Sequence, residues 1–491
     1  MGWIGMAMFG VAVVAMIVTG LPVYALLLAV AALFSALGVM LGAFDLALLG
    51  ALPSRVVGLL EHDLLQALPL YALIGALLNR LPLAASMHAG GERIFGRSPA
   101  GPQMSALCVG ALLAPMNGSV GASLHMLAHR VAPGLAARGV EPAEAAATVC
   151  VASTLGIVIP PSLVLLLLGD AMMRAHTEAL NITRASVQIV NTQDVMRAAL
   201  LPGLLVLLLA LGVATWRVRS RIRPRPSALP PLPPRAGVTA AIAAAVIVAL
   251  LGAVAVGRLF AVEAAATGGL LLLGWGLVTR RLNRGTLRRV LADAMGLTGL
   301  LMALLVGATA FSLVLRGFGT DAWVAAGLHR LDPHPFGMLA AVLAGLVVCS
   351  FVLDAFEMIF LVVPLVMPPL LAVVPDAAWV AALTLLVLQL GFLLPPLGYA
   401  VVMSRSAMPS APPLAHLARA LRPQLLAQAL LIAAVLAWPA LTRIGRDAPD
   451  APSAVLAPNT PADDAALNDA MRALGGRSGG SVDREPPSTK P

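Results

Sequence analysis

Oxygen-bearing side chains and glycines gather in two stretches of the first half of the chain, each inside apolar sequence. Oxygen ligands of this kind suit a hard cation, and two such loops facing each other would form a small-cation cage. The alternative is that the small residues permit close helix packing and that the hydroxyls bond the preceding helical turn. The candidate residues are Asn117, Gly118, Ser119, Ser123, Ser153, Thr154 and Gly156.

Two carboxylates stand in apolar sequence in the second half. Asp354 and Glu357 are three residues apart, so they share one face of a helix. A carboxylate inside a membrane suggests a cation ligand, a proton carrier or the partner of a buried arginine. The alternative is that both lie at a hairpin end, near headgroups and water. Gln389 is a further candidate, although a lone buried glutamine more often joins two helices by a hydrogen bond.

The pattern Gly-x-x-x-Pro-Pro occurs once in each half. It runs from Gly156 to Pro160 and Pro161, followed by Ser162, and from Gly391 to Pro395 and Pro396. Each proline removes a backbone donor and clashes with the carbonyl four residues earlier, so each helix must break there. Unpaired backbone groups are tolerated in a membrane where they line a protein-enclosed cavity, and a matched pair of broken helices indicates the binding site of a secondary transporter. The alternative is two unrelated proline kinks packed against neighbouring helices.

The composition identifies the class of protein. Of the 491 residues, 59% are hydrophobic and 11% are charged, whereas about a quarter of the residues in a soluble domain are charged. The net charge of +9 comes from arginines between apolar spans, which is a signal of topology and not of nucleic-acid binding. The three cysteines lack metal-type spacing. We find no zinc-protease, hydrolase or Gly-Lys nucleotide-binding motif.

Apolar spans of about 20 residues predict a polytopic all-α membrane protein. The N-terminal span lacks a clear cleavage site, so we expect it to be retained. Predicted helices cover about 3–19, 22–43, 63–80, 143–175, 198–217, 237–257, 260–279, 291–315, 378–404 and 422–441, and interrupted apolar segments cover 104–128 and 337–374.

Arginine clusters at 217–235 and 280–289 predict that both segments face the cytoplasm. We count the predicted spans outward from these two cytoplasmic segments. By this count, segment 104–128 enters and leaves the membrane on one face, and segment 337–374 enters and leaves it on the opposite face. Each half would then contain a re-entrant hairpin followed by a broken helix, which is the inverted repeat of an alternating-access carrier.

The predicted topology divides the chain into four parts. The predicted parts are a first inverted repeat over 1–216, with hairpin 104–138 and broken helix 143–175; a basic Pro-rich cytoplasmic linker over 217–236; a second inverted repeat over 237–441, with hairpin 337–374 and broken helix 378–404; and a disordered tail over 442–491.

The same motifs resemble a known family over about residues 1–441. The hairpin 117–123, the run 153–162 with Gly169-Asp170 downstream, and the run 353–357 are together similar to the large membrane subunit of tripartite ATP-independent periplasmic (TRAP) transporters. The resemblance implies sodium-driven uptake of an organic acid by an elevator motion in the bacterial inner membrane. It also implies a small membrane subunit and a periplasmic binding protein that delivers the substrate, with no cofactor besides the coupling Na⁺.

By this resemblance, a first sodium site with the adjoining substrate pocket includes Asn117, Ser119, Ser123, Ser153, Thr154 and Gly156, and a second includes Asp354, Gln389, Gly391, Pro395 and Pro396. Further candidates for binding the substrate or ion are Gly118, Pro160, Pro161 and Ser162. The direct Na⁺ candidates are Ser119, Ser153, Thr154 and Asp354. The sequence departs from the family at the second site, where Leu394, Val387 and Leu390 replace the usual polar residues. Either Asp354 acts there with backbone carbonyls, or this cation site has been lost.

The sequence therefore predicts a carrier subunit that binds a small carboxylate between its two broken helices. Half-helix N-termini would face the anion, while free carbonyls would coordinate Na⁺. A stand-alone elevator symporter that needs no binding protein is the alternative within transport. An integral-membrane enzyme is a more distant one, because polar residues in a membrane core can also be catalytic.

Overall fold

The chain forms an all-α polytopic membrane protein. The computed structural model describes residues 1–61, 63–96, 98–183, 190–219, 234–255, 257–331, 334–408 and 411–443, and these residues contain helices and no strand. Seven of the described helices are long and apolar enough to cross a membrane, and two bent helix pairs raise this number to nine if each is one span. Most of the predicted linker 217–236 and nearly all of the predicted tail 442–491 lie outside the described residues.

The first half begins with apolar helices and a bent pair. At the bend, Pro82 follows the extended Leu81, and the two helices α5 and α6 meet at 67°. These elements are α1 (Gly2–Thr19), α2 (Val23–Met40), α3 (Leu46–Leu49), α4 (Leu52–Leu60), η1 (Asp63–Gln66), α5 (Ala67–Arg80) and α6 (Leu83–Ile94).

A helical hairpin and a broken helix follow. The break between α10 and α11 falls at Pro160 and Pro161, as predicted, and bends the pair by 41°. The elements are α7 (Gly101–Leu113), η2 (Pro115–Asn117), α8 (Val120–Arg130), α9 (Ala132–Ala137), α10 (Pro142–Val158), α11 (Leu163–Thr183) and α12 (Thr192–Arg219).

The second half also contains a hairpin, a broken helix and a closing helix, and the long helix α15 precedes them. Its break lies between α20 and α21, at Pro395 and Pro396. The elements are α13 (Pro234–Ala255), α14 (Ala261–Val278), α15 (Arg284–Gly317), α16 (Thr320–Leu331), α17 (Pro335–Cys349), α18 (Ala355–Glu357), η3 (Met358–Val362), α19 (Val363–Leu371), α20 (Ala377–Leu393), α21 (Tyr399–Ala407), α22 (Leu414–Ala437) and η4 (Pro439–Thr442).

Local chemistry explains where the broken helices begin and end. Pro142 occupies the first turn of α10, where its missing N–H costs no hydrogen bond. Asp376 caps α20 by accepting the Trp379 N–H at 3.1 Å. The helix α11 restarts at Ser162, whose Oγ accepts the Leu165 N–H at 3.1 Å. Helices α10 and α20 end just before the Pro-Pro pairs, because each pair removes two consecutive backbone donors.

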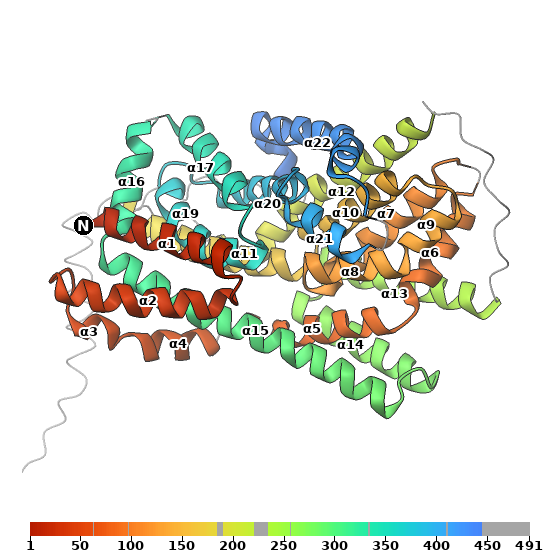
Figure 1. Cartoon of the computed structure of the whole chain (residues 1–491), viewed down its shortest axis with the longest axis horizontal. Helices are drawn as coiled ribbons and strands as arrows, with labels where there is room; N and C mark the ends of the chain where they lie inside the picture. The colour runs from red at the N-terminus through yellow and green to blue at the C-terminus, as the bar shows by residue number, and fades with distance from the viewer. Residues whose placement is uncertain are drawn as a thin grey trace, which may run out of the picture. The chain divides into compact units, whose positions relative to one another are not determined.

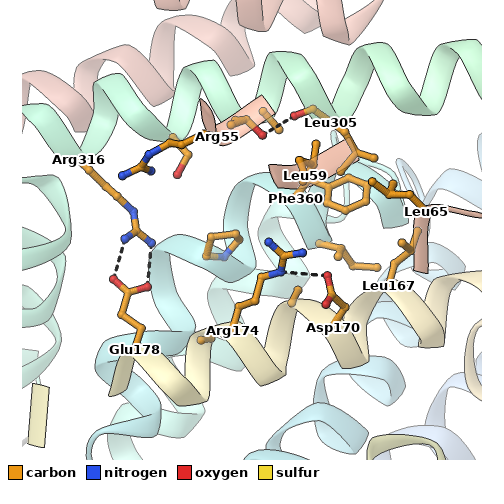
Figure 2. A pocket seen from close by; sticks show the side chains of 17 residues that line it. Arg55, Leu59, Leu65, Leu167, Asp170, Arg174, Glu178, Leu305, Arg316 and Phe360 are labelled. Atoms are coloured by element: carbon orange, nitrogen blue, oxygen red, sulfur yellow. Dashed lines mark hydrogen bonds and ion pairs between the residues drawn. The ribbon is translucent and has the colours of Figure 1, made fainter. Parts of the chain in front are cut away.

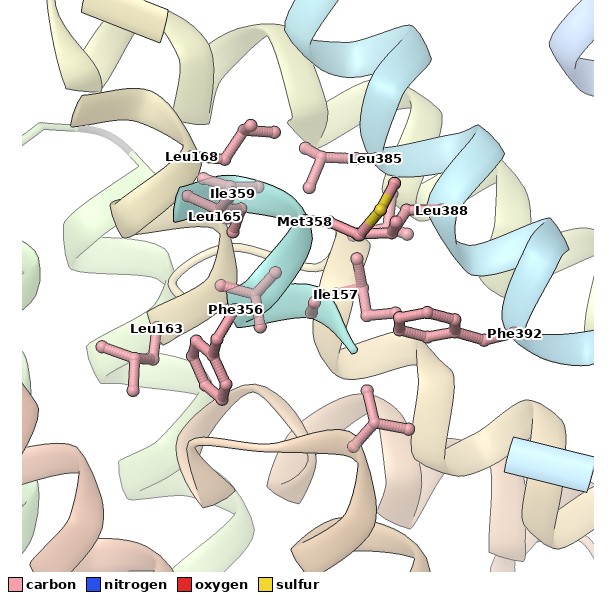
Figure 3. Close-up of a cluster of buried hydrophobic side chains, with 14 of the residues drawn as sticks. Ile157, Leu163, Leu165, Leu168, Phe356, Met358, Ile359, Leu385, Leu388 and Phe392 are labelled. Atoms are coloured by element: carbon pink, nitrogen blue, oxygen red, sulfur yellow. The ribbon is translucent and has the colours of Figure 1, made fainter. Parts of the chain in front are cut away.

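The broken helices lie at the centre of the contacts between the two halves. Helix α10 packs against α7 and α8 of the first hairpin and also against α20, while α20 packs against α17 of the second hairpin. Away from the broken helices, the long helix α15 runs along α2 and α5 (Figure 1). Apolar side chains from α10, α11, α18, η3 and α20 meet in one buried cluster, which includes Ile157, Leu165, Phe356, Met358 and Phe392 (Figure 3). This cluster fixes the breaks relative to the second hairpin.

Two helical segments lie outside the spans predicted from hydropathy. Residues 316–334 contain α16, and the segment before the predicted span 63–80 contains α3 and α4. Neither is long enough to appear as an apolar span of about 20 residues, so the hydropathy pattern does not reveal them.

Candidate functional site

The turn of the first hairpin is built by Gly118 and Ser119. Gly118 has φ +78°, a conformation that favours glycine. Ser119 then caps α8, because its Oγ accepts the Ala122 N–H at 3.1 Å. The Ser123 hydroxyl donates to the Ser119 carbonyl at 2.9 Å and lies 3.4 Å from the Ala114 carbonyl. These oxygens therefore surround one tight turn.

Asn117 in the same turn has an unusual environment. Its side chain is fully buried, and neither its amide nitrogen nor its amide oxygen has a hydrogen-bond partner among the described residues. Gly75 of α5 packs against it, since a methyl group on Gly75 would lie 3.0 Å from Asn117 Oδ1. Leaving a buried amide unpaired costs about 1–3 kcal/mol. The position therefore suits a ligand that would satisfy this amide.

The first broken helix carries Ser153 and Thr154 in its last turns. Both side chains are fully buried, and each hydroxyl donates to a carbonyl of its own helix, Ser153 to Cys150 at 2.8 Å and Thr154 to Val151 at 2.9 Å. Their protons are thus used within α10, while oxygen lone pairs remain to accept. A methyl group on Gly156 would lie 2.6 Å from the Ala114 carbonyl carbon, so the hairpin turn sits directly on this helix.

Asp354 and Glu357 cap the short helix in the second hairpin. Asp354 Oδ1 accepts the N–H groups of Phe356 and Glu357, both at 2.9 Å, and Glu357 Oε2 accepts the Asp354 N–H at 2.9 Å. This reciprocal arrangement is a capping box. Within the described ranges no basic side chain pairs with either carboxylate. The sequence left three roles open for these carboxylates. Among the described residues, the role as partner of a buried arginine is not found.

Gln389 of the second broken helix reaches the first. Its side-chain nitrogen lies 3.5 Å from Thr154 Oγ1, and its side-chain oxygen accepts the amide of Gln428 in α22 at 3.0 Å. Gln428 also donates to the Leu386 carbonyl at 3.3 Å. The resemblance grouped Gln389 with Asp354, whereas its recorded side-chain contacts lie with Thr154 and Gln428.

The second break also connects the two halves. A methyl group on Gly391 would lie 2.0 Å from Ser350 Oγ, so the second hairpin turn sits on α20. After the prolines, a methyl group on Gly121 of α8 would lie 2.8 Å from the Tyr399 hydroxyl. Asp354 and Glu357 lie within electrostatic reach of the same phenol. The start of α21 thus lies close to both hairpins.

Sequence reasoning missed Gln428 and Tyr399. Gln428 is a fully buried amide in an otherwise apolar stretch of α22, which is the signal that singled out Gln389 and could have found it. Tyr399 had no such signal, because its role depends on which helices pack around the second break. The predicted prolines and Ser162 lie in the breaks themselves, where Ser162 acts as a cap.

The chain matches known proteins over most of its length. A profile of the tripartite ATP-independent periplasmic transporter DctM component matches residues 10–441. The C4-dicarboxylate TRAP transporter large permease protein DctM of Pseudomonas aeruginosa is 24% identical over 343 residues, which are 69% of this chain and 76% of that protein.

Two solved transporters share the fold. The Alcanivorax borkumensis YdaH transporter has a TM-score of 0.53 and 16% identity over 82% of this chain and 89% of its own. Neisseria gonorrhoeae MtrF, described as illuminating a class of antimetabolite efflux pumps, has a TM-score of 0.53 and 14% identity over 79% and 83%. The profile match covers far more than half of the chain and excludes the enzyme alternative: the chain belongs to the DctM family, the large permeases of TRAP secondary transporters.

Proposed function

We propose that this chain carries a small organic acid across the bacterial inner membrane and that Na⁺ is the coupling ion. The observation that supports this most directly is the contact of each hairpin turn with the glycine four residues before a Pro-Pro break, Gly156 in one half and Gly391 in the other. Matched broken helices of this kind provide unpaired backbone groups at the centre of a carrier. In this proposal the solute binds between the two breaks.

The residues of the first hairpin fit a sodium ion. Asn117 supplies a buried amide oxygen without a partner among the described residues. Ser153 and Thr154 supply hydroxyl oxygens that can still accept, although Thr154 Oγ1 already receives the Gln389 amide at 3.5 Å. Hard cations prefer such oxygen ligands. We propose that these three residues, with Ser119 and Ser123, hold the first Na⁺, which would supply the driving force for uptake when bound.

The second sodium site rests on Asp354. Its Oδ1 is used by two backbone amides, so Oδ2 is the atom that a cation would engage. Because Leu394, Val387 and Leu390 offer no side-chain oxygen, backbone carbonyls near the second break would complete the site. We therefore propose an Asp354-centred site with few side-chain ligands.

We propose a C4-dicarboxylate or a similar organic acid as the solute, because the curated relative from P. aeruginosa is named for C4-dicarboxylates. The family implies a small membrane subunit and a periplasmic binding protein as partners. An elevator motion would carry the two broken helices and their hairpins together across the membrane.

Reconstitution tests the proposal. The purified permease and its small subunit are placed in proteoliposomes, and accumulation of labelled succinate, malate, fumarate and pyruvate is measured with and without the binding protein and an inward Na⁺ gradient. We expect accumulation only when both are present. Uptake without a binding protein would favour the stand-alone symporter, and accumulation independent of Na⁺ would refute the sodium coupling.

A further inference from the structure

A cavity away from the Pro-Pro breaks is lined by three arginines. It has a volume of about 190 Å³ and lies between α4 and α15 on one side and α11, η3 and α19 on the other. The arginines are Arg55 of α4, Arg174 of α11 and Arg316 of α15, and all three side chains extend into the same space (Figure 2). Arg55 and Arg174 are exposed and Arg316 is partly buried, so a solute that enters the cavity can reach all three guanidinium groups.

Two of the three arginines in this cavity have carboxylate partners. Arg316 forms a two-pronged ion pair with Glu178 at 2.7 and 2.9 Å, and Arg174 pairs with Asp170 at 3.1 Å. Arg55 has no carboxylate partner in the part of the chain that the structure describes. Arg316 Nε also lies 4.0 Å from Asp321 Oδ2. Of the three arginines, Arg55 is therefore the one that an incoming anion would meet without a carboxylate partner among the described residues.

The remaining wall of the cavity is mostly apolar, with hydroxyl groups from Thr309 and Ser312. Leu59, Leu167, Leu305 and Phe360 face the arginines. The volume is below the roughly 300–1,000 Å³ of pockets that hold drug-sized ligands. The cavity therefore suits a short organic acid with one carboxylate directed at the arginines.

A second cavity of about 450 Å³ adjoins the first. The two share Glu178, Arg316 and Pro364 as lining residues, so the Arg316–Glu178 pair lies between them. The topology predicted from the arginine clusters places this end of α15 outside the cytoplasm. A solute that arrives from the periplasmic side would then meet the ion pair before it reaches Arg55.

We propose that this cavity is an entry site for the carboxylate of the incoming organic acid, an inference that rests on the proposed function. Arg55 binds one carboxylate oxygen, and the solute displaces Glu178 from Arg316. The exchange is isosteric, because a solute carboxylate offers the guanidinium the same two oxygens that Glu178 offers. Glu178 thus competes with the solute, and the ion pair closes the cavity when no solute is present.

The test measures solute binding to the purified permease with its small subunit, for the acid that the proteoliposomes accumulate. Arg55→Gln should weaken binding by at least about tenfold, which is the contribution of one charge-assisted hydrogen bond to affinity. Arg55→Lys should lose less, because it keeps the charge but not the planar fork. Glu178→Gln should bind the solute more tightly, because it removes the competing charge. Arg288→Gln, an exposed arginine at the other end of α15, is the matched control and should bind as the wild type does.

The outcomes separate the two proposals. If the wild type accumulates no organic acid, the proposed function fails and this inference fails with it. If it accumulates one but Arg55→Gln binds it normally, or the wild-type permease does not bind it, the entry site is wrong and the function stands. Unchanged or weaker binding in Glu178→Gln overturns the exchange at Arg316. Native mass spectrometry that finds phosphatidylglycerol lost in Arg55→Gln, with solute binding unchanged, would assign the cavity to a lipid phosphate and overturn the inference.

Discussion

Gly391 of α20 packs against Ser350 at the turn of the second hairpin, so closely that a methyl group on the glycine would lie 2.0 Å from Ser350 Oγ and 2.9 Å from its Cβ. Gly156 of α10 stands in the same relationship to Ala114 at the turn of the first hairpin. Each glycine lies four residues before its Pro-Pro pair. The repeated sequence pattern thus corresponds to a repeated contact, in which a hairpin turn rests on a helix just before it breaks.

Gly391→Ala should destabilise this contact. The Ser350 hydroxyl is held by the Val347 carbonyl at 2.7 Å, so it cannot turn away without losing that hydrogen bond. Overpacking of this kind costs about 1–3 kcal/mol. We expect a lower melting temperature in detergent and reduced uptake. Gly345→Ala, in the neighbouring helix where a methyl group meets nothing within 4 Å, should melt at or above the wild-type temperature. Equal melting of the two variants would show that the contact is loose.

The local consequences of the prolines could be predicted from the sequence. Loss of consecutive donors sets both breaks, and the polar residues at 117–123 and 153–156 are indeed in a hairpin turn and beside a break. Contacts between distant segments could not be predicted in the same way. Arg316 and Glu178 are 138 positions apart, and Gln389 and Gln428 are 39 apart. No local pattern reports such a pair, because it depends on which helices pack together.

The buried glutamine pair allows a test by a double-mutant cycle. Gln389→Leu and Gln428→Leu each leave the other amide with a lost partner in the core, which costs about 1–3 kcal/mol. The double variant replaces both amides by apolar groups and should be less destabilised than the sum of the two single variants. Melting temperatures of all four proteins check this. Strict additivity would mean that the hydrogen bond contributes nothing.

The proposed first sodium site predicts a specific kinetic change. Ser153→Ala combined with Thr154→Val removes two buried oxygens and keeps their approximate volume. We expect a higher sodium concentration at half-maximal uptake, with surface expression little changed. Thr298→Val is the matched control, because Thr298 also donates to its own helix, to the Ala294 carbonyl at 2.8 Å, and is not one of the proposed sodium ligands. Unaltered sodium dependence in the double variant would favour the helix-packing interpretation of the two hydroxyls.

The predicted topology can be tested by cysteine labelling. In a background without Cys108, Cys150 and Cys349, an impermeant thiol reagent added to intact cells should not reach Arg284→Cys, because the arginine cluster around it predicts a cytoplasmic loop. Arg258→Cys, in the turn between α13 and α14, should label. Permeabilised cells provide the control, since both positions should then react. Labelling of Arg284→Cys from outside would remove the argument for the inverted repeat.

Asp354 has two candidate functions, as a cap of the short helix α18 and as a ligand of the coupling ion. Two substitutions separate them, because one keeps the cap and the other removes it. Asparagine is as good an N-cap as aspartate, so Asp354→Asn should keep the hydrogen bonds to Phe356 and Glu357 while removing the charge that a bound ion requires. Asp354→Ala should lose the cap as well, at a cost of about 1 kcal/mol.

If Asp354 couples the ion to transport, both variants should lose concentrative uptake, and only Asp354→Ala should also melt at a lower temperature. Glu357→Gln preserves an oxygen for the Asp354 N–H and should have the smaller effect on uptake, because in the proposed site it does not bind the ion. Paired measurements of sodium-driven accumulation and thermal stability decide between the roles. Wild-type accumulation by Asp354→Asn at limiting sodium would mean that this carboxylate is only a helix cap and that the second cation site lies elsewhere or is absent.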